Sequence, residues 1–565
     1  MRHFLHGPAL PHAPTLLRAT ALLLALTLLA PGCGARSAET RDPNAIVCAW
    51  IGGADGFNPL VATSSASQMV YHLIYSALVD MDSRSDMRPN WPTSLISHVD
   101  IQDGGKRYVL HLRRGVRWSD GTPLLADDVV FSVRLIANPG LPESNPGDFS
   151  LMRSVRALDD HTIELRLASP SPPFLENALG ETFVLPKRIL RRYPADSKAE
   201  AKFVIGDAAF SQHPVISGPW RIERSVRDSY LILTPNPRYW GRRPLLDEIA
   251  FRVYPEQDSL YAAVAAGEVD VTDIPPQLWR VRRRLRGNYT FVDWPWNVAF
   301  TLVPNYHDPA IPWMSDPLVK RAMMYALDRQ FMIDGILSGQ GDVLNGPLPT
   351  FSPYYDRSVA TYRYDPAQAR RLLEADGWKL RGNVRMKAGK ALRITLKTEG
   401  ATDAVGSAIA ELIQANFRAV GIDCSLDNEE LQTFFNDELS SNFQLALTGV
   451  ILLPYPDGYK RDYSTQTRAN GGYNEGFYSN PHIDRAIETA RTAPSPRIAR
   501  AALDRYQELA SHDLPRLYLY SNRLGAVVPR NLSGYVLTPL SPAALPMGLE
   551  FWHISPRKSA ARSSP

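Results

Sequence analysis

Hydrophobic and polar residues alternate over residues 108–114, and a helical spacing replaces this alternation over residues 129–136. A period of two is typical of a half-buried strand, because successive side chains of a strand point to opposite faces. Ser119-Asp120-Gly121 supplies turn chemistry between the two patterns. Asp127 and Asp128 precede the helical stretch, where carboxylates can accept free backbone N–H groups and meet the positive end of the helix dipole. The segment therefore predicts a strand, a tight turn and a capped helix.

The same two periods predict an α/β chain without internal repeats. Strands are expected at residues 45–50, 392–397, 517–520 and 526–529, with antiparallel pairs at 156–167 and between a strand at Trp220 and residues 230–234. Helices are expected at residues 67–78, from Asp316 to Gly335 or Gly339, after Asp365-Pro366, and at 404–420, 481–491 and 495–511.

Composition favours a large folded body. With 565 residues, of which 44% are hydrophobic and 21% charged, the chain can bury a sizeable core and divide into about two or three lobes. The net charge of +4 is small for this length and the basic residues are scattered, so a nucleic-acid partner is not expected. The one basic run, residues 280–286, is interpreted as a solvated surface.

The N-terminus has the features of a secretory signal. Basic residues precede residues 19–29, an apolar run too short to span a bilayer as a stable helix, and small residues lead to Cys33. This arrangement resembles a bacterial lipoprotein signal, which implies that Cys33 becomes the lipidated first residue of the mature chain. Leu29 lies one place further from the cysteine than that pattern prefers, so cleavage near Ala35 or Ala38, giving a free periplasmic protein, stays open.

Cysteine and histidine usage gives no sign of a metal or cofactor. Cys48 and Cys424 lie far apart in the sequence, without a Cys-x-x-Cys motif or a zinc-type His spacing, and the 12 histidines form no cluster. The two cysteines are interpreted as small buried apolar residues. A disulfide between them stays open, since an oxidising compartment would permit one.

Several motifs in a fixed order carry a family resemblance. LRRGVRWSDG with ADDVVFS, then PNPRYWGRRPLLDEI, AAVAAGEVDVTDI and DPLVKRAMMYALDR, are among the matches that recur between Asp55 and Gly534. In this order they resemble the family 5 extracellular solute-binding proteins, the periplasmic or lipid-anchored receptors of peptide, nickel and related ABC importers. The resemblance covers nearly the whole mature chain.

The resemblance implies an α/β fold of the two-lobed periplasmic binding protein type (type II), with an extra subdomain inserted in the first lobe. By that analogy we expect a signal peptide with a lipobox at 1–33, a flexible tether at 34–42, a first lobe from 43–75, 215–300 and 516–553, an inserted subdomain at 76–214, a second lobe at 301–515 and a disordered tail at 554–565.

The function implied by the resemblance is solute binding by hinge closure rather than chemistry. The chain would be the extracytoplasmic component of an ABC importer, a monomer that captures an oligopeptide or peptide-like solute between its lobes and delivers it to permease and ATPase subunits. It would lie in the periplasm or cell envelope, touching the membrane only through a lipid at Cys33.

Candidate ligand-binding residues come from two predicted loops, at residues 56–59 and 455–463, and from the aromatic run at 294–297. Aromatic faces suit apolar parts of a ligand and an asparagine can orient an amide. The candidates are Phe57, Asn58, Trp294, Trp296, Asn297, Tyr455 and Asp457. Each has an alternative interpretation: Trp294 and Trp296 alternate, so they share a face that could equally be core, and Asn58-Pro59 also has the chemistry of a plain turn.

The second lobe departs from the family at one position. Peptide-binding members carry an aspartate there that pairs with the free α-amino group of the ligand. The corresponding position here falls on Leu453 or Pro454, and the nearest carboxylate is Asp457, in a Pro-Asp-Gly sequence that also favours a turn. The resulting hypothesis is that the ligand lacks a free α-amine or is held differently.

Two other classes of function remain as alternatives. An enzyme, such as a periplasmic hydrolase, is disfavoured because the sequence has no G-x-S-x-G, H-E-x-x-H, Walker loop or dinucleotide fingerprint. A ligand sensor or envelope chaperone of the same fold is not distinguished from an importer by the sequence.

Overall fold

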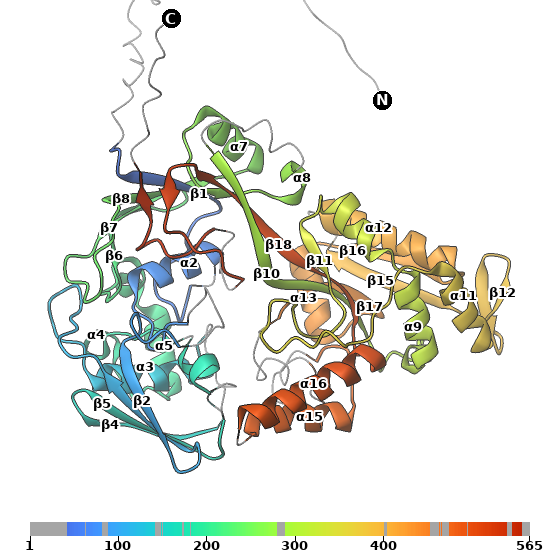
Figure 1. Cartoon of the computed structure of the whole chain (residues 1–565), viewed down its shortest axis with the longest axis horizontal. Coiled ribbons are helices and arrows are strands. Elements are labelled where there is room, and N and C mark those ends of the chain that lie inside the picture. The colour runs from blue at the N-terminus through green and yellow to red at the C-terminus, as the bar shows by residue number, and fades with distance from the viewer. Residues whose placement is uncertain are drawn as a thin grey trace, which may run out of the picture. The chain divides into compact units, whose positions relative to one another are not determined.

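The computed structural model describes residues 42–555, except 63, 82–88, 142–148, 150, 172–173, 181, 280–288, 400–403, 453–462, 464, 466–473, 494 and 540–544 (Figure 1). Cys33, Leu453, Pro454, Tyr455, Asp457 and the basic run at 280–286 therefore lie outside the described residues.

The first sheet has four strands, in the order β1-β8-β7-β6. Their bounds are β1 Ala45–Ile51, β6 Trp220–Val226, β7 Tyr230–Pro235 and β8 Glu248–Tyr254. β6 and β7 form the predicted antiparallel pair. The helix α2 (Ser65–Ile74) contributes Met69, Val70 and Ile74 to the core that also includes the apolar residues of this sheet.

The second sheet also has four strands, in the order β2-β3-β5-β4. The strands are β2 Ile96–Gln102, β3 Arg107–Leu112, β4 Met152–Asp159 and β5 Thr162–Leu167. The predicted hairpin is β4–β5. The predicted capped helix is α3 (Ala126–Ile136), whose residue Asp128 accepts the Leu125 N–H at 3.0 Å and the Lys187 N–H at 2.9 Å. The Asp128 carboxylate therefore caps the start of α3 and also holds the segment at Lys187 against it.

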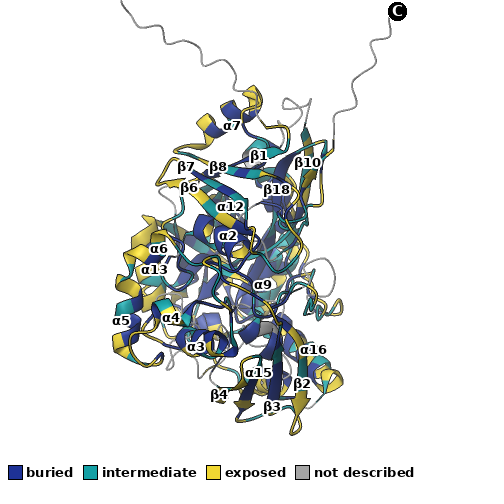
Figure 2. Ribbon diagram, turned by 90° about the vertical axis from the view of Figure 1, so that its left-hand side faces the viewer, coloured by how far each residue is buried: buried dark blue, intermediate teal, exposed yellow. Residues whose placement is uncertain are grey.

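The third sheet has seven strands, and its path runs β11-β18-β10-β17-β15-β16, with β9 added to β18. The bounds are β9 Thr272–Asp273, β10 Tyr289–Pro304, β11 Gly341–Val343, β15 Arg393–Glu399, β16 Asp423–Glu429, β17 Leu445–Ile451 and β18 Leu517–Pro529. β15 pairs in parallel with β16 and β17, and α12 (Ala404–Ala419) and α13 (Leu431–Ser440) lie between these strands along the chain. The long strands β10 and β18 run antiparallel and side by side in Figure 1, and Figure 2 shows that β18 is largely buried.

The remaining helices surround these sheets. The longer ones are α5 Lys198–Gly206, α7 Gln257–Ala266, α9 Pro317–Ala326, α11 Pro366–Ala375, α15 Pro481–Thr492 and α16 Pro496–Asp513. The shorter elements are α4 Lys187–Leu190, α6 Ala208–Gln212, α8 Pro276–Trp279, α10 Arg329–Phe331, β12 Lys379–Arg381, β13 Val384–Lys387, β14 Lys390–Ala391, β19 Leu532–Ser533, β20 His553–Ile554, π-helical turns at Leu175–Leu179 and Met332–Ile336, and a 3₁₀ turn at Pro312–Ser315.

Two predictions of secondary structure are wrong. The single helix from Asp316 to Gly335 or Gly339 ends at Ala326, because Leu327 is extended (ψ 118°) and Asp328 starts a new turn by accepting the Phe331 N–H at 3.0 Å. The two strands at 517–520 and 526–529 are one strand, β18, because Ser521 and Asn522 continue the ladder by pairing with β11.

The cysteines are buried in different sheets. Cys48 lies in β1 and Cys424 in β16, and both are buried and reduced. Burial raises the pKa of the Cys424 thiol to about 12. The interpretation as small buried residues is confirmed, and the alternative of a disulfide between them is wrong.

Candidate functional site

The predicted aromatic run lies where the pairing of β10 with β18 is interrupted and its pairing with β17 begins. β10 pairs with β18 up to Pro295, the register then shifts until Ala299, and pairing with β17 begins at Val298 opposite Ile451. Proline has no N–H to donate to a ladder, so a break beside Pro295 has a direct cause. The irregular segment contains Trp296 and Asn297, and irregularities of this kind re-aim side chains.

Trp294 and Trp296 contact the same apolar cluster, as their alternation predicts. Trp294 is 3% exposed and packs with Leu524 and Ala526, while Trp296 is half-buried and packs against this group. Trp294 is therefore a core residue of the crossing strands. Trp296, which keeps an exposed part, is the better candidate for contact with a ligand.

Asn297 ties this segment to Leu452, the last described residue before 453–462. Its backbone N–H donates to Pro539 O at 3.2 Å, and its carbonyl accepts the Leu452 N–H at 2.7 Å. Tyr455 and Asp457, the other two candidates, lie outside the described residues.

The next described residue, Tyr463, is also anchored. Tyr463 is 2% exposed, lies 5.4 Å from the Arg516 guanidinium (ring centroid to Cζ), and packs edge-on against Tyr506 with centroids 5.9 Å apart. Arg516 in turn pairs with the buried Glu475 at 3.2 Å. Leu452 and Tyr463 are therefore held by the third sheet and by α16.

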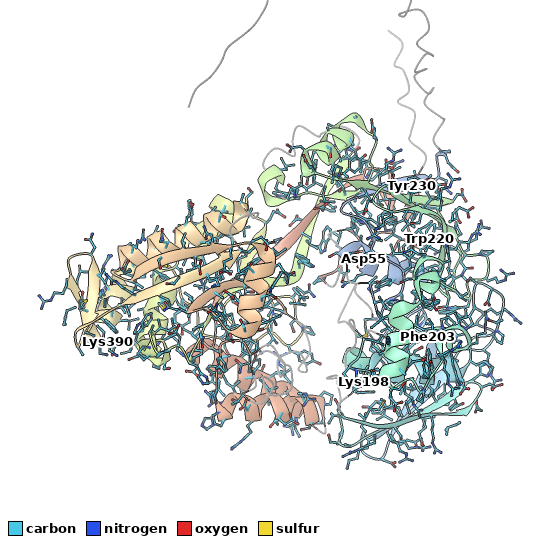
Figure 3. All side chains as sticks on the ribbon, turned by 180° about the vertical axis from the view of Figure 1, so that it is seen from behind. Asp55, Lys198, Phe203, Trp220, Tyr230 and Lys390 are labelled. Carbon is cyan, nitrogen blue, oxygen red and sulfur yellow. The ribbon has the colours of Figure 1, made fainter. Side chains whose placement is uncertain are left out.

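Phe57 and Asn58 have structural contacts. Phe57 is 3% exposed in the core of the first sheet, and its N–H donates to Ser211 O at 2.8 Å. Asn58 is fully buried and its Oδ1 accepts the Leu60 N–H at 3.1 Å. This hydrogen bond forms the turn that was the alternative interpretation of Asn58-Pro59. Asp55, labelled in Figure 3, holds the same loop to α2 by accepting the Ser67 hydroxyl at 2.6 Å. Contact of Phe57 and Asn58 with a ligand stays a prediction.

Asp273, on β9, is a residue that the sequence analysis did not select. Its Oδ1 accepts the hydroxyl of Thr272 at 3.2 Å, and it forms no ion pair with any described residue. Burial raises the pKa of the Asp273 carboxyl above its ordinary value. The segment AAVAAGEVDVTDI contains Asp270 too, but Asp270 accepts the Val47 N–H at 2.8 Å, and no sequence signal separates the two carboxylates.

Charged side chains on β10, β11 and β18 pair with one another. Arg523 pairs with Asp293 at 2.7 Å and with Asp342 at 3.3 Å, which joins β18 to β10 and β11. These charges therefore stabilise the sheet.

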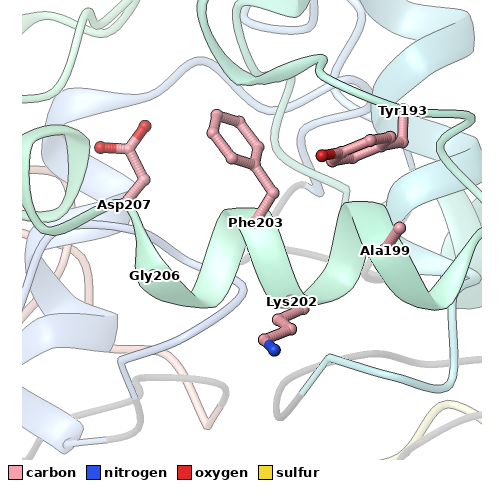
Figure 4. Close-up of a pocket in the computed structure, with 6 residues that line it drawn as sticks. All are labelled: Tyr193, Ala199, Lys202, Phe203, Gly206 and Asp207. Carbon is pink, nitrogen blue, oxygen red and sulfur yellow. The ribbon is translucent and has the colours of Figure 1, made fainter.

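One pocket in the described part of the chain lies elsewhere. It is an open depression of about 600 Å³ around α5, lined by Tyr193, Ala199, Lys202, Phe203, Gly206 and Asp207. Figure 4 shows the rings of Tyr193 and Phe203 on one side of the helix and Lys202 on the other. Such an open surface depression differs from the enclosed sites that hold small ligands.

Within the described ranges, no three or more His, Cys, Asp or Glu side chains gather as metal ligands. In the same part of the chain, no helix is both long enough and apolar enough to cross a bilayer.

Comparison with known proteins connects this architecture to one family. The model of the bacterial extracellular solute-binding proteins, family 5, matches residues 58–472. The chain is 26% identical over 500 residues to the oligopeptide-binding protein AppA of Bacillus subtilis, covering 87% of this chain and 89% of that one. It is 25% identical over 476 residues to the nickel-binding periplasmic protein of Escherichia coli, covering 80% and 84%.

Solved structures show the same fold. NikA from Brucella suis, in complex with Fe(III)-EDTA, has a TM-score of 0.77 at 22% identity, covering 90% of this chain and 100% of that one. AppA from Bacillus subtilis, in complex with a nonapeptide, has a TM-score of 0.73 at 24% identity, covering 90% and 99%. The predicted two-lobed α/β fold is thereby confirmed. The chain belongs to family 5 of the bacterial extracellular solute-binding proteins, which work in transport outside the cytoplasm.

Proposed function

We propose that this protein captures an oligopeptide or peptide-like solute for an ABC importer. The proposal includes the lobes expected above, with 43–75, 215–300 and 516–553 forming the first, 76–214 inserted in it and 301–515 forming the second. A ligand held by both lobes favours the closed form, because only that form makes both sets of contacts.

The observation that carries the proposal is the interruption of β10 at Trp296-Asn297. Regular pairing with β18 is interrupted there, a half-buried indole packs beside an apolar cluster, and the Asn297 carbonyl accepts the Leu452 N–H. Peptide is the favoured solute because the relatives named above include an oligopeptide-binding protein, and a dipeptide-binding protein of Escherichia coli is 24% identical over 518 residues.

The mature protein, in this proposal, is a monomer anchored by a lipid on Cys33 and delivers its solute to permease and ATPase subunits. Intact mass spectrometry of the chain from its native membrane tests the anchor. We expect diacylglycerol and acyl masses on a chain starting at Cys33, whereas an unmodified chain starting after Ala35 or Ala38 contradicts it.

Native mass spectrometry of the purified mature protein tests the solute. We expect a ladder of peptide masses released on activation, together with an upward shift of the melting temperature when a pool of tri- to pentapeptides is added. A single non-peptide mass, or no melting shift with any peptide pool, would overturn the assignment of peptide as the solute.

A further inference from the structure

We propose that the carboxylate of Asp273 binds a positively charged amine of the solute. This inference rests on the proposed function and names the chemical group that the crossing strands would recognise. Three observations carry it: the face on which Asp273 lies, the absence of a basic partner among the described residues, and the aromatic cluster on the same face.

The strand register places Asp273 on the tryptophan face of the crossing strands. Asp273 on β9 lies opposite Ala526 on β18, and Ala526 lies opposite Val292 on β10. Side chains directly opposite one another in an antiparallel pair share a face, and so do residues two apart in one strand. Ala526 belongs to the cluster of Trp294 and Leu524, against which Val292 and Trp296 also pack. Asp273 therefore borders this cluster.

The nearest base on these strands is used on the other face. Arg523 lies opposite Pro295, one position away from the Trp294–Leu524 pair, so its side chain points away from the tryptophan face. Its ion pairs with Asp293 and Asp342 agree with that direction. Arg523 consequently does not neutralise Asp273.

Two other carboxylates near these strands differ from Asp273 in their partners. The half-buried Asp270 accepts a backbone N–H, and the buried Glu475 pairs with Arg516. The exposed Asp293 pairs with Arg523. Asp273 has a hydroxyl contact at 3.2 Å, yet it is half-buried and burial raises the pKa of its carboxyl. A half-buried carboxylate without a cation is unfavourable for the free protein, and an ammonium group from a ligand would supply the missing charge.

A second acceptor lies further along the same face. Asn522 is two residues before Leu524 in β18, and its buried Oδ1 has no hydrogen-bond partner in the described part of the chain. A primary ammonium carries three donors and no acceptor, so it suits a carboxylate better than a hydroxyl or amide group does. The exposed part of Trp296 can meet apolar atoms next to that ammonium.

Isothermal titration of the full mature chain with matched peptide pools tests the proposal. One pool of tri- to pentapeptides keeps its free amines, and the second is the same pool acetylated at every amine. We expect the wild type to bind the free-amine pool roughly 10- to 100-fold more tightly, as a charge-assisted contact allows. Asp273→Asn should remove that preference without weakening binding of the acetylated pool.

Asp258→Asn is the matched control, because Asp258 is an exposed residue in the first turn of α7. It should keep the wild-type preference. Equal affinity of the wild type for both pools, or an unchanged preference in Asp273→Asn, overturns the role of Asp273 and leaves the proposed function standing. Failure of the wild type to bind either pool overturns the peptide assignment itself, and the role of Asp273 with it.

Discussion

Glu164 on β5 and Asp273 on β9 are both carboxylates on strands, and their surroundings are opposite. The Glu164 side chain is 1% exposed and contacts Arg107 at 2.5 Å, Arg156 at 2.8 Å and Arg166 at 3.2 Å. Hydrogen bonds from Arg166 and Arg107, with Arg156, lower the pKa of Glu164 to about 2. Asp273 forms no ion pair with any described residue, and burial raises the pKa of its carboxyl.

The difference shows how a charge that serves the fold can be told from one that serves a ligand. Glu164 neutralises guanidinium groups from β3, β4 and β5, so its charge holds the second sheet together. Asp273 holds no such set of strands together by charge. Because burial raises the pKa of its carboxyl, we expect the carboxylate of Asp273 to lower the stability of the free protein, and a ligand cation to remove that cost.

The largest effect is expected from Trp294, on the same face of the crossing strands as Asp273. Trp294→Ala should destabilise the protein by about 3–5 kcal/mol, because it leaves a cavity among Leu524 and Ala526. Trp296→Ala is the matched variant, with a smaller change in stability and a roughly tenfold loss of peptide affinity. Urea unfolding and peptide titration measure the two effects. Equal stability losses would mean that neither indole is reserved for the ligand.

The next largest loss of stability is expected from Glu164→Gln. Three arginines would lose their common anion, and the expected loss is about 1–3 kcal/mol at pH 7, moderated because the guanidinium groups are partly solvated. The folded-state pKa lies below the ordinary value of 4.5, so this stabilisation is present above pH 4.5 and is lost as the pH falls toward 2. Melting temperatures of wild type and variant should therefore converge in acid. A constant gap across that range would contradict the ion-pair explanation.

Asp273→Asn should change the stability in the opposite direction. It removes a charge that the free protein does not neutralise, so we expect stability to be unchanged or to rise by up to about 1 kcal/mol. The folded-state pKa is raised, so the wild type should gain stability relative to the variant as the pH falls through that pKa toward 3.8. Thermal unfolding without ligand checks this. A destabilised variant would show that Asp273, like Glu164, has a structural partner.

Local patterns predicted most of the elements near these sites. Alternation identified the β4–β5 hairpin, and the Asp-Pro and Asn-Pro pairs marked the starts of α9, α11 and α15. The patterns failed where tertiary contacts decide. Asn416 Oδ1 accepts the Asp328 N–H at 2.8 Å, just after α9 has ended, and pairing with β11 carries β18 through Ser521 and Asn522.

The candidate site was predicted only in part, for a similar reason. The spacing of Trp294 and Trp296 indicated a shared face, and the structure places both in one cluster. Which of them is core, and which of Asp270 and Asp273 lacks a strong partner, depends on strands more than 200 residues apart in the chain, as the Asp270–Val47 contact shows. Periodicity contains no information about such pairings.

The smallest effect is expected from Asp100, which separates burial from position on a face. Asp100 lies on β2, in the same sheet as Glu164, and contacts His98 at 2.9 Å and His111 at 3.0 Å. Hydrogen bonds from His111 and His98 lower the pKa of Asp100, but its side chain is 45% exposed, so water can replace the histidines at little cost. Asp100→Asn should leave the melting temperature at pH 7 within experimental error of the wild type. A loss comparable to that of Glu164→Gln would mean that membership of this sheet, rather than burial under guanidinium groups, makes a carboxylate structural, and the same reasoning could then no longer set Asp273 apart.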